Sequence, residues 1–234
     1  MGIIALIFLI LTAGLLVADL KQPKRFLYVL LRPQWHSWLV RGAYLLTGYG
    51  ALLTLWLAAH LAGARALSAG LMWPTALLAV GAAVYTAFLF AQAKGRDFWQ
   101  NPLLPIHMLV HALLAGTAVW LAVDAVSGSD ISTARVATIV ALIVSLVTLS
   151  AEILTTPPTA DAQRALKWII ADRMGAFPIW VLGVGHIGPL VVLFLCQDND
   201  IGRVCLAVTG ALILWGLHCL EYLWVTAPQR LPLS

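Results

Sequence analysis

Several ionisable side chains of this sequence stand inside long apolar stretches. His107 and His111 are four residues apart, which places both on one face of a helix. His186 and His218 stand in two later stretches, and Glu221 follows His218 at the i+3 position of the same face. Such groups are costly inside a membrane, so each is by default a candidate for function. Imidazoles and carboxylates of this kind can relay protons, hydrogen-bond a ligand or ligate a haem iron.

The amino-acid composition indicates that these stretches lie in a lipid bilayer. Hydrophobic residues are 62% of the 234 residues and charged residues only 10%, against about 25% charged residues in a soluble domain. The mean hydropathy is +0.93. A chain this poor in charge cannot cover a surface that faces water, and the same figures exclude a disordered chain. The net charge of +4 comes from 14 Lys and Arg without a basic run, which argues against nucleic-acid binding.

The cysteines predict no metal site. Cys196, Cys205 and Cys219 are widely spaced and form no CxxC pair. We therefore expect no cysteine-ligated zinc or iron–sulfur cluster, and no metal in this chain. Free cysteines most often serve as small buried hydrophobic residues.

Seven stretches are long and apolar enough to cross a bilayer, which takes about 20 residues. They are rich in Leu and Ala and do not alternate, so they favour helices over the strands of a barrel. The sequence thus predicts an all-α polytopic membrane helix bundle with seven transmembrane helices. We expect these helices at about Met1–Ala18, Trp38–Ala62, Leu71–Gln92, Leu103–Val123, Ala134–Ile153, Ala176–Cys196 and Val204–Val225.

Seven spans put the two chain ends on opposite sides of the membrane. The side of Ser234, here called the near side, receives most basic residues, whereas Arg65, Arg135 and Arg203 fall on the far side. The positive-inside rule would make the near side cytoplasmic, but residues that bind a partner protein give the same distribution. Near-side loops are also longer and chemically richer, so we expect both the partner and the chemistry there.

Three near-side segments have a distinctive sequence. They read DLKQPKRF at 19–26, AQAKGRDFW at 91–99 and EYLW at 221–224; the first, followed by LRP at 31–33 and SWL at 37–39, is the most specific. Together they resemble the NrfD/PsrC family, the integral membrane subunits of polysulfide-reductase-like complexes. The resemblance extends over essentially the whole chain.

The resemblance implies a membrane anchor of a respiratory complex in the cytoplasmic membrane of a bacterium or archaeon. Such an anchor binds a quinone, menaquinone or ubiquinone, and docks an iron–sulfur electron-transfer subunit. That subunit in turn contacts a catalytic subunit, typically a molybdenum-pterin oxidoreductase. This chain would then react with quinone and not with the terminal substrate.

The family fold is a pair of four-helix bundles, with the quinone in the N-terminal one. We accordingly expect one bundle over residues 1–126 and a second over residues 127–234. In the family the Asp-Leu-x-x-Pro segment usually ends the second span, but here Asp19 ends the first. The resemblance thus leads us to expect that this sequence lacks the counterpart of the family's first helix, which contributes polar residues to the quinone pocket. Either the gene is shortened, or the start codon is misplaced, or another chain supplies the helix.

Quinone chemistry needs hydrogen-bond donors for the carbonyl oxygens and a proton route to water. Asp19 and Tyr85 stand at similar depth, within about 10 Å of the near surface, so Tyr85 could donate and Asp19 could exchange protons. The alternative is an interfacial Tyr and a helix-end Asp paired with a lysine or arginine. Further candidates for the quinone site are His107, His111, Arg41 and Ser37.

Two further sets of residues complete the expectations. A proton path through the C-terminal bundle would use His186, His218 and Glu221, because the two histidines lie at nearly matching depths. Simple hydrogen bonding between helices is the alternative for these residues. Docking of the partner would use Lys21, Arg25, Lys94, Arg96 and Asp97.

Two other functions compete with the quinone-linked subunit. One is a cytochrome b-type anchor with haem between His186 and His218, since imidazole is a common axial ligand. The other is a transporter, against which the sequence shows no inverted repeat.

Overall fold

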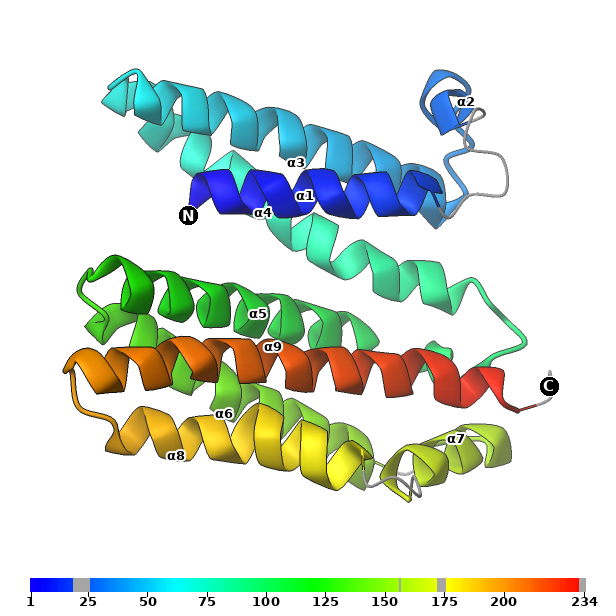
Figure 1. The fold of residues 1–234 in the computed structure, drawn as a ribbon. Coiled ribbons are helices and arrows are strands. Elements are labelled where there is room, and N and C mark those ends of the chain that lie inside the picture. Colours follow the sequence, from blue (N-terminus) through cyan, green and yellow to red (C-terminus); the bar gives the residue numbers. More distant parts are fainter. Residues whose placement is uncertain (19–25, 156, 172–175, 232–234) are drawn as a thin grey trace. The chain divides into compact units, whose positions relative to one another are not determined.

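The computed structural model describes residues 1–18, 26–155, 157–171 and 176–231, and within these ranges the regular structure is entirely helical (Figure 1). Six helices within the described ranges are long and apolar enough to span a membrane. The chain is therefore a multi-pass membrane protein, as predicted. The first expected span forms α1 (Gly2–Ala18), an apolar helix of 17 residues. At 1.5 Å per residue it rises about 26 Å, slightly less than the hydrocarbon core.

The first compact unit covers Met1–Gln92. It contains α1, the short α2 (Phe26–Leu31), α3 (Trp38–Leu61) and α4 (Arg65–Ala91). Helix α3 packs along α4 and also contacts α1. Because α4 begins at Arg65, the third span starts several residues earlier than the hydropathy of the sequence indicated.

The second compact unit covers Ala93–Ser234. A 3-10 turn, η2 (Asp97–Gln100), precedes four spans that lie side by side (Figure 1). Helix α5 packs against both α6 and α9, and α9 also packs against η3 and the short near-side helix α7. The elements are α5 (Leu104–Ser127), α6 (Ser132–Leu154), α7 (Ala160–Ile170), η3 (Ala176–Ile187), α8 (Gly188–Leu195) and α9 (Asp200–Gln229).

The division between the units differs from the predicted boundary. It falls between Gln92 and Ala93, whereas the sequence analysis placed it after residue 126. Helix α5 consequently belongs to the second unit, where Leu114 and Leu121 are fully buried with the other core side chains. Outward-facing Val126 is 80% exposed, as a lipid-facing position requires.

The sixth span is not a single α-helix. Its first part, η3, is a π-helix that continues into α8. Gly185 of η3 lies directly against Gly216 of α9, and a Cβ on Gly185 would stand 2.6 Å from the Gly216 Cα. Only residues without a side chain permit this approach of two backbones, as is usual where helices pack closely in lipid.

We predict that Gly216→Ala destabilises the second unit, because the new methyl group would collide with the Gly185 backbone. An overpacked contact of this kind costs about 1–3 kcal/mol. Gly116→Ala on α5 is the matched control, since a Cβ there meets no atom within 4 Å. Thermal unfolding in detergent should show a lower midpoint for Gly216→Ala and an equal or higher one for Gly116→Ala. Equal midpoints would show that the backbones separate without cost.

Candidate functional site

Four ionisable side chains meet inside the second unit. His107 and His111 come from α5, Glu152 from α6 and Glu221 from α9. His107 is fully buried, and His111 and Glu152 are 6% and 3% exposed. The Glu221 side chain is partly covered, at 33% exposure. The i, i+4 spacing on α5 puts the two imidazole rings at 3.9 Å between centroids.

Short polar contacts connect the four groups. Glu152 Oε2 lies 2.8 Å from His107 Nδ1, and Glu221 Oε1 lies 2.6 Å from His111 Nδ1. The same Glu221 oxygen stands 3.5 Å from His107 Nε2. An ionised carboxylate only accepts, so each Nδ1 carries the proton in these bonds. Glu221 thus bridges the two histidines, and Glu152 holds His107 from the other side.

The hydrogen bonding of this cluster is incomplete. His107 Nε2, His111 Nε2 and Glu152 Oε1 are buried and have no hydrogen-bond partner among the described residues. Buried polar groups are nearly always paired, and each exception calls for an explanation such as an ordered water or an ion. Three such atoms in one cluster make it a candidate site for an ordered water or an ion.

Aromatic side chains cover the cluster. The Trp224 ring stacks on His107 at 4.8 Å between centroids, and Phe98 lies 4.7 Å from Trp224. Trp99 is also buried, and its indole N–H donates to the Trp224 carbonyl at 3.4 Å. Because Phe98 and Trp99 belong to η2, the segment before α5 closes the cluster together with the end of α9.

His186 makes separate contacts deeper in the same unit. It is fully buried, and its Nδ1 donates to the Val181 carbonyl at 2.8 Å across the wide turn of η3. Its Nε2 lies 3.0 Å from Ser145 Oγ on α6. Neither ring nitrogen is therefore available to a metal.

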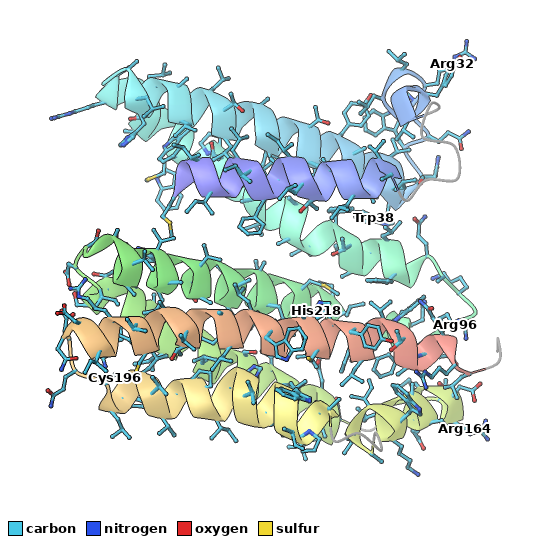
Figure 2. All side chains as sticks on the ribbon, in the orientation of Figure 1. Arg32, Trp38, Arg96, Arg164, Cys196 and His218 are labelled. Atoms are coloured by element: carbon cyan, nitrogen blue, oxygen red, sulfur yellow. The ribbon has the colours of Figure 1, made fainter. Side chains whose placement is uncertain are left out.

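His218 corrects the predicted pairing with His186. Its side chain is exposed on the outside of α9 (Figure 2) and contacts Trp215, at 5.8 Å between ring centroids. Glu221, expected on the same face, points instead to His107 and His111. With His218 outside and His186 hydrogen-bonded, this arrangement does not support a haem between them. The proton path through His186, His218 and Glu221 stays a prediction.

Tyr85 belongs to the first unit and is buried between α3 and α4. Its ring lies against Gly42, where an added Cβ would collide with the aromatic carbons. The α3–α4 contact continues toward the near side, where Trp38 stacks on Phe88 at 4.3 Å and its backbone N–H donates to Gln92 Oε1 at 3.1 Å. These contacts fix the depth and direction of the Tyr85 side chain.

Arg41 and Ser37 stand at the near-side start of α3. Ser37 precedes the helix in an extended conformation. Arg41 Nε donates to the Trp35 carbonyl at 2.7 Å, and its guanidinium lies 4.7 Å from the centre of the Trp38 ring. Arg41 is thus held at the helix start, and among the described residues only its Nε has a hydrogen-bond acceptor. Asp19, Lys21 and Arg25 lie outside the described residues.

A groove of about 390 Å³ lies between α1 and α3 of the first unit. Such a volume falls within the range of small-molecule sites, about 300–1,000 Å³. Thr47 is polar, and its hydroxyl donates to the Ala43 carbonyl at 2.7 Å, which leaves its lone pairs for a ligand. The lining residues are Leu9, Ala13, Gly14, Leu16, Val17, Ala43, Leu46 and Thr47.

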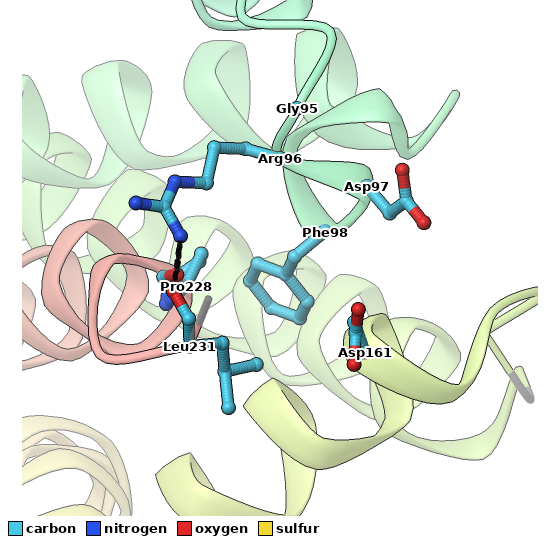
Figure 3. Close-up of a pocket in the computed structure, with 7 residues that line it drawn as sticks. All are labelled: Gly95, Arg96, Asp97, Phe98, Asp161, Pro228 and Leu231. Atoms are coloured by element: carbon cyan, nitrogen blue, oxygen red, sulfur yellow. Dashed lines mark hydrogen bonds between the residues drawn. The ribbon is translucent and has the colours of Figure 1, made fainter. Parts of the chain in front are cut away.

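The predicted docking residues of the second unit have unequal surroundings. Lys94 is exposed and contacts Gln100 Oε1 at 3.4 Å. Arg96 instead donates to the carbonyls of Pro228 and Leu231, at 2.7 and 2.6 Å, and so fastens the end of α9 (Figure 3). Asp97 borders a space of about 10 Å³ beside them, enough for about one water molecule. That space is no ligand site.

We expect Arg96→Gln to loosen the last turn of α9, because two hydrogen bonds from a charged donor are lost. Each contributes about 1.5–3 kcal/mol. Lys94→Gln is the matched control, since its exposed contact contributes little. Hydrogen exchange of the amides at the end of α9 should accelerate in Arg96→Gln alone. Equal exchange in both variants would contradict the fastening role of Arg96.

The fold and its buried ionisable groups define a polytopic helical membrane subunit. The chain matches the family model described as polysulphide reductase, NrfD, over residues 1–232. It therefore belongs to the NrfD family of membrane subunits of polysulfide-reductase-like complexes, and the resemblance seen in the sequence is confirmed. Neither the curated proteins nor the solved structures include one that matches the chain.

The sequence analysis did not single out Glu152. It stands near the end of its span, where a carboxylate is common at a membrane interface, so its position alone carried no signal. The structure buries it against His107. The predicted place of His107 and His111 beside Asp19 and Tyr85 stays a prediction, because Tyr85 belongs to the first unit and the histidines to the second.

Proposed function

We propose that this chain is the quinone-reactive membrane subunit of a respiratory oxidoreductase complex in the cytoplasmic membrane of a bacterium or archaeon. It exchanges two electrons between menaquinone or ubiquinone and the clusters of an iron–sulfur partner. A molybdenum-pterin subunit beyond that partner carries the terminal chemistry. The observation that carries the proposal is the apolar groove between α1 and α3, in a chain of the NrfD family.

The groove has the character that a quinone requires. Its walls are almost entirely aliphatic, and Thr47 is the polar exception. Ala43 lines the groove and follows Gly42, against which the Tyr85 ring packs. Tyr85 does not itself line the groove, so in this proposal its phenol reaches the quinone past Gly42 and donates a hydrogen bond to a carbonyl oxygen.

We assign the hydrogen-bond donation and the proton exchange of quinone reduction to different polar residues. Reduction of a quinone takes up two electrons and two protons, so a donor must hold the carbonyl oxygen while protons arrive. We assign the donor role to Tyr85 and the proton exchange to Asp19, which follows α1 in the chain. Arg41 and Ser37, at the near-side start of α3, would hold the head group from the water side.

The partner docks on the near side in this proposal. Lys21, Arg25 and Lys94 are the cations that would set its association, since charges at the rim of an interface govern encounter. Asp97, three residues after Lys94, adds a carboxylate to this set. Arg96 contributes indirectly, because it positions the end of α9.

Tyr85→Phe tests the donor role. The variant keeps the ring that packs on Gly42 and removes only the hydroxyl. The loss of one hydrogen bond to a buried oxygen costs about 1–3 kcal/mol, so the affinity for quinone should fall about 5- to 150-fold. The measurement compares quinone-dependent with dye-dependent turnover of the purified complex.

Tyr49→Phe on α3 is the control, since Tyr49 loses the same hydroxyl but stands about two helical turns along α3 from Gly42, where the Tyr85 ring packs,. We expect only Tyr85→Phe to lose quinone-dependent turnover, with dye-dependent turnover unchanged in both variants. Parallel loss of the two activities would point to damaged assembly. Unchanged quinone turnover in Tyr85→Phe would exclude Tyr85 from the site.

A further inference from the structure

In the neutral ring of His107, the Nε2 nitrogen faces the Glu221 carboxylate with no proton between the two atoms. Its Nδ1 donates to Glu152 Oε2 at 2.8 Å, so in the neutral ring Nε2 presents a lone pair. The nearest charged atom is Glu221 Oε1 at 3.5 Å. Nε2 has no hydrogen-bond partner among the described residues. Two electron-pair donors at this separation need a cation between them.

Protons alone would neutralise the charge of this cluster poorly. The buried Glu152 and the partly exposed Glu221 carry two negative charges when both are ionised, and neutrality then requires both histidines to be imidazolium. Their rings are only 3.9 Å apart between centroids, and two like charges at that distance repel strongly inside a bundle. One divalent ion would instead neutralise both carboxylates and leave both imidazoles neutral.

We propose that His107, His111 and Glu221 bind a divalent transition-metal ion, with zinc as the best fit. The candidate ligand atoms of the three residues all lie within 4.8 Å of one another. Ligands at about 2.0–2.1 Å from a tetrahedral zinc stand about 3.3 Å apart, close to the 3.5 Å between His107 Nε2 and Glu221 Oε1. Nitrogen and carboxylate ligands together suit zinc better than magnesium or calcium.

Glu152 has the position of an orienting residue behind a metal ligand. A histidine that ligates a metal almost always donates its other N–H to a carboxylate or carbonyl, which fixes the ring. Glu152 Oε2 accepts a hydrogen bond from His107 Nδ1, and its Oε1 has no partner among the described residues. The remaining coordination position can take a water molecule. Glu221, with its side chain 33% exposed, gives the ion a way in.

Binding should move a proton within His111. In the metal-free cluster His111 Nδ1 donates to Glu221 Oε1 at 2.6 Å, and both atoms cannot ligate one ion while this proton stays between them. The neutral ring carries it on Nε2 instead, so no proton leaves a ring that starts neutral. Metal affinity still rises with pH, because an imidazolium cannot ligate an ion and must first lose a proton. Zinc has no redox chemistry, so the ion would fix α5 and α9 together and carry no electron.

The test uses the full chain, purified in detergent and dialysed against a chelator. It is titrated with Zn²⁺ by calorimetry, and with Co²⁺ as a spectroscopic substitute. We expect one ion per chain, a higher unfolding temperature with Zn²⁺, and tetrahedral Co²⁺ absorption without a thiolate charge-transfer band. The last point excludes the free Cys196, Cys205 and Cys219 as ligands.

Variants identify the ligands. His111→Ala should lower the Zn²⁺ affinity at least about 100-fold, and Glu152→Gln about 10- to 100-fold, the usual effect of a group behind a ligand. His218→Ala is the matched control, because His218 is exposed on α9 away from the cluster. Circular dichroism of each metal-free variant checks that it is folded.

Two results would overturn the proposal. The wild-type chain could take up less than one Zn²⁺ with no change in unfolding temperature, which would make the cluster a proton-bridged network. Equal affinities in His111→Ala and His218→Ala would place the ion elsewhere. Neither result would affect the quinone proposal, which concerns the first unit.

Discussion

His107→Leu should lower the free energy of unfolding by about 3–5 kcal/mol, the cost of breaking a buried ion pair from one side. The expectation follows from burial, since His107 is fully buried and Glu152 is 3% exposed. Without His107, Glu152 loses its hydrogen-bond partner at 2.8 Å but stays inside the bundle. The large loss of stability is the cost of keeping the Glu152 carboxylate buried without a hydrogen-bond partner.

A double variant separates this penalty from lost packing. His107→Leu combined with Glu152→Leu replaces both partners by apolar side chains, which is often neutral relative to the pair. We expect the double variant to recover most of the stability that His107→Leu loses, while the contact between His111 and Glu221 remains. His218→Leu, at an exposed position, should change stability by less than about 0.5 kcal/mol.

The measurement is unfolding in detergent, without added metal, of the wild type, both single variants and the double variant. A strong favourable coupling between His107 and Glu152 supports the buried pair. Additive effects of the two substitutions would mean that the two side chains do not interact, contrary to the geometry.

The membrane spans could be predicted from the sequence, but the partners of each helix could not. Composition and run length are sufficient to place helices in lipid, and the α5, α6 and α9 spans were all expected. Membrane helices are apolar on nearly every face, so periodicity does not show which face meets which neighbour. The i, i+4 pairing of His107 and His111 was visible, whereas their contacts with Glu152 and Glu221 depend on how α5 packs on α6 and α9.

The π-helix explains why His186 and His218 do not pair. The predicted depths assumed regular helices with 3.6 residues per turn, but η3 is wound more widely,. Its backbone contact with α9 at Gly185 and Gly216 then sets which face of α9 looks inward. That face carries Gly216, Leu217 and Leu220, and His218 is left on the outside.

The basic residues illustrate a second limit of sequence reasoning. A count of near-side charges treats Lys94 and Arg96 alike, and both were expected to meet a partner. The structure gives Arg96 an internal role through the Pro228 and Leu231 carbonyls, while Lys94 stays exposed. A charge reversal at Arg96 would damage the end of α9, so Lys94 is the cleaner probe of docking.

The groove between α1 and α3 leads to a second strong prediction, the effect of Gly14→Phe. Gly14 lines the groove, and a Cβ built on it meets no atom within 4 Å. The new side chain can therefore enter the groove without displacing α1 or α3. A benzyl group has about the bulk of a quinone ring and would occupy the same space, so quinone is excluded and not merely held more weakly.

We expect quinone-dependent turnover of the complex with Gly14→Phe to fall more than about 100-fold, beyond the typical effect of one lost hydrogen bond. Dye-dependent turnover should persist, because the partner subunits are intact. Gly70→Phe on α4 is the matched control, since its Cβ also meets no atom within 4 Å and Gly70 does not line the groove. Wild-type quinone turnover in Gly14→Phe would exclude the groove as the quinone site, and an equal loss in both variants would assign the effect to the added bulk itself.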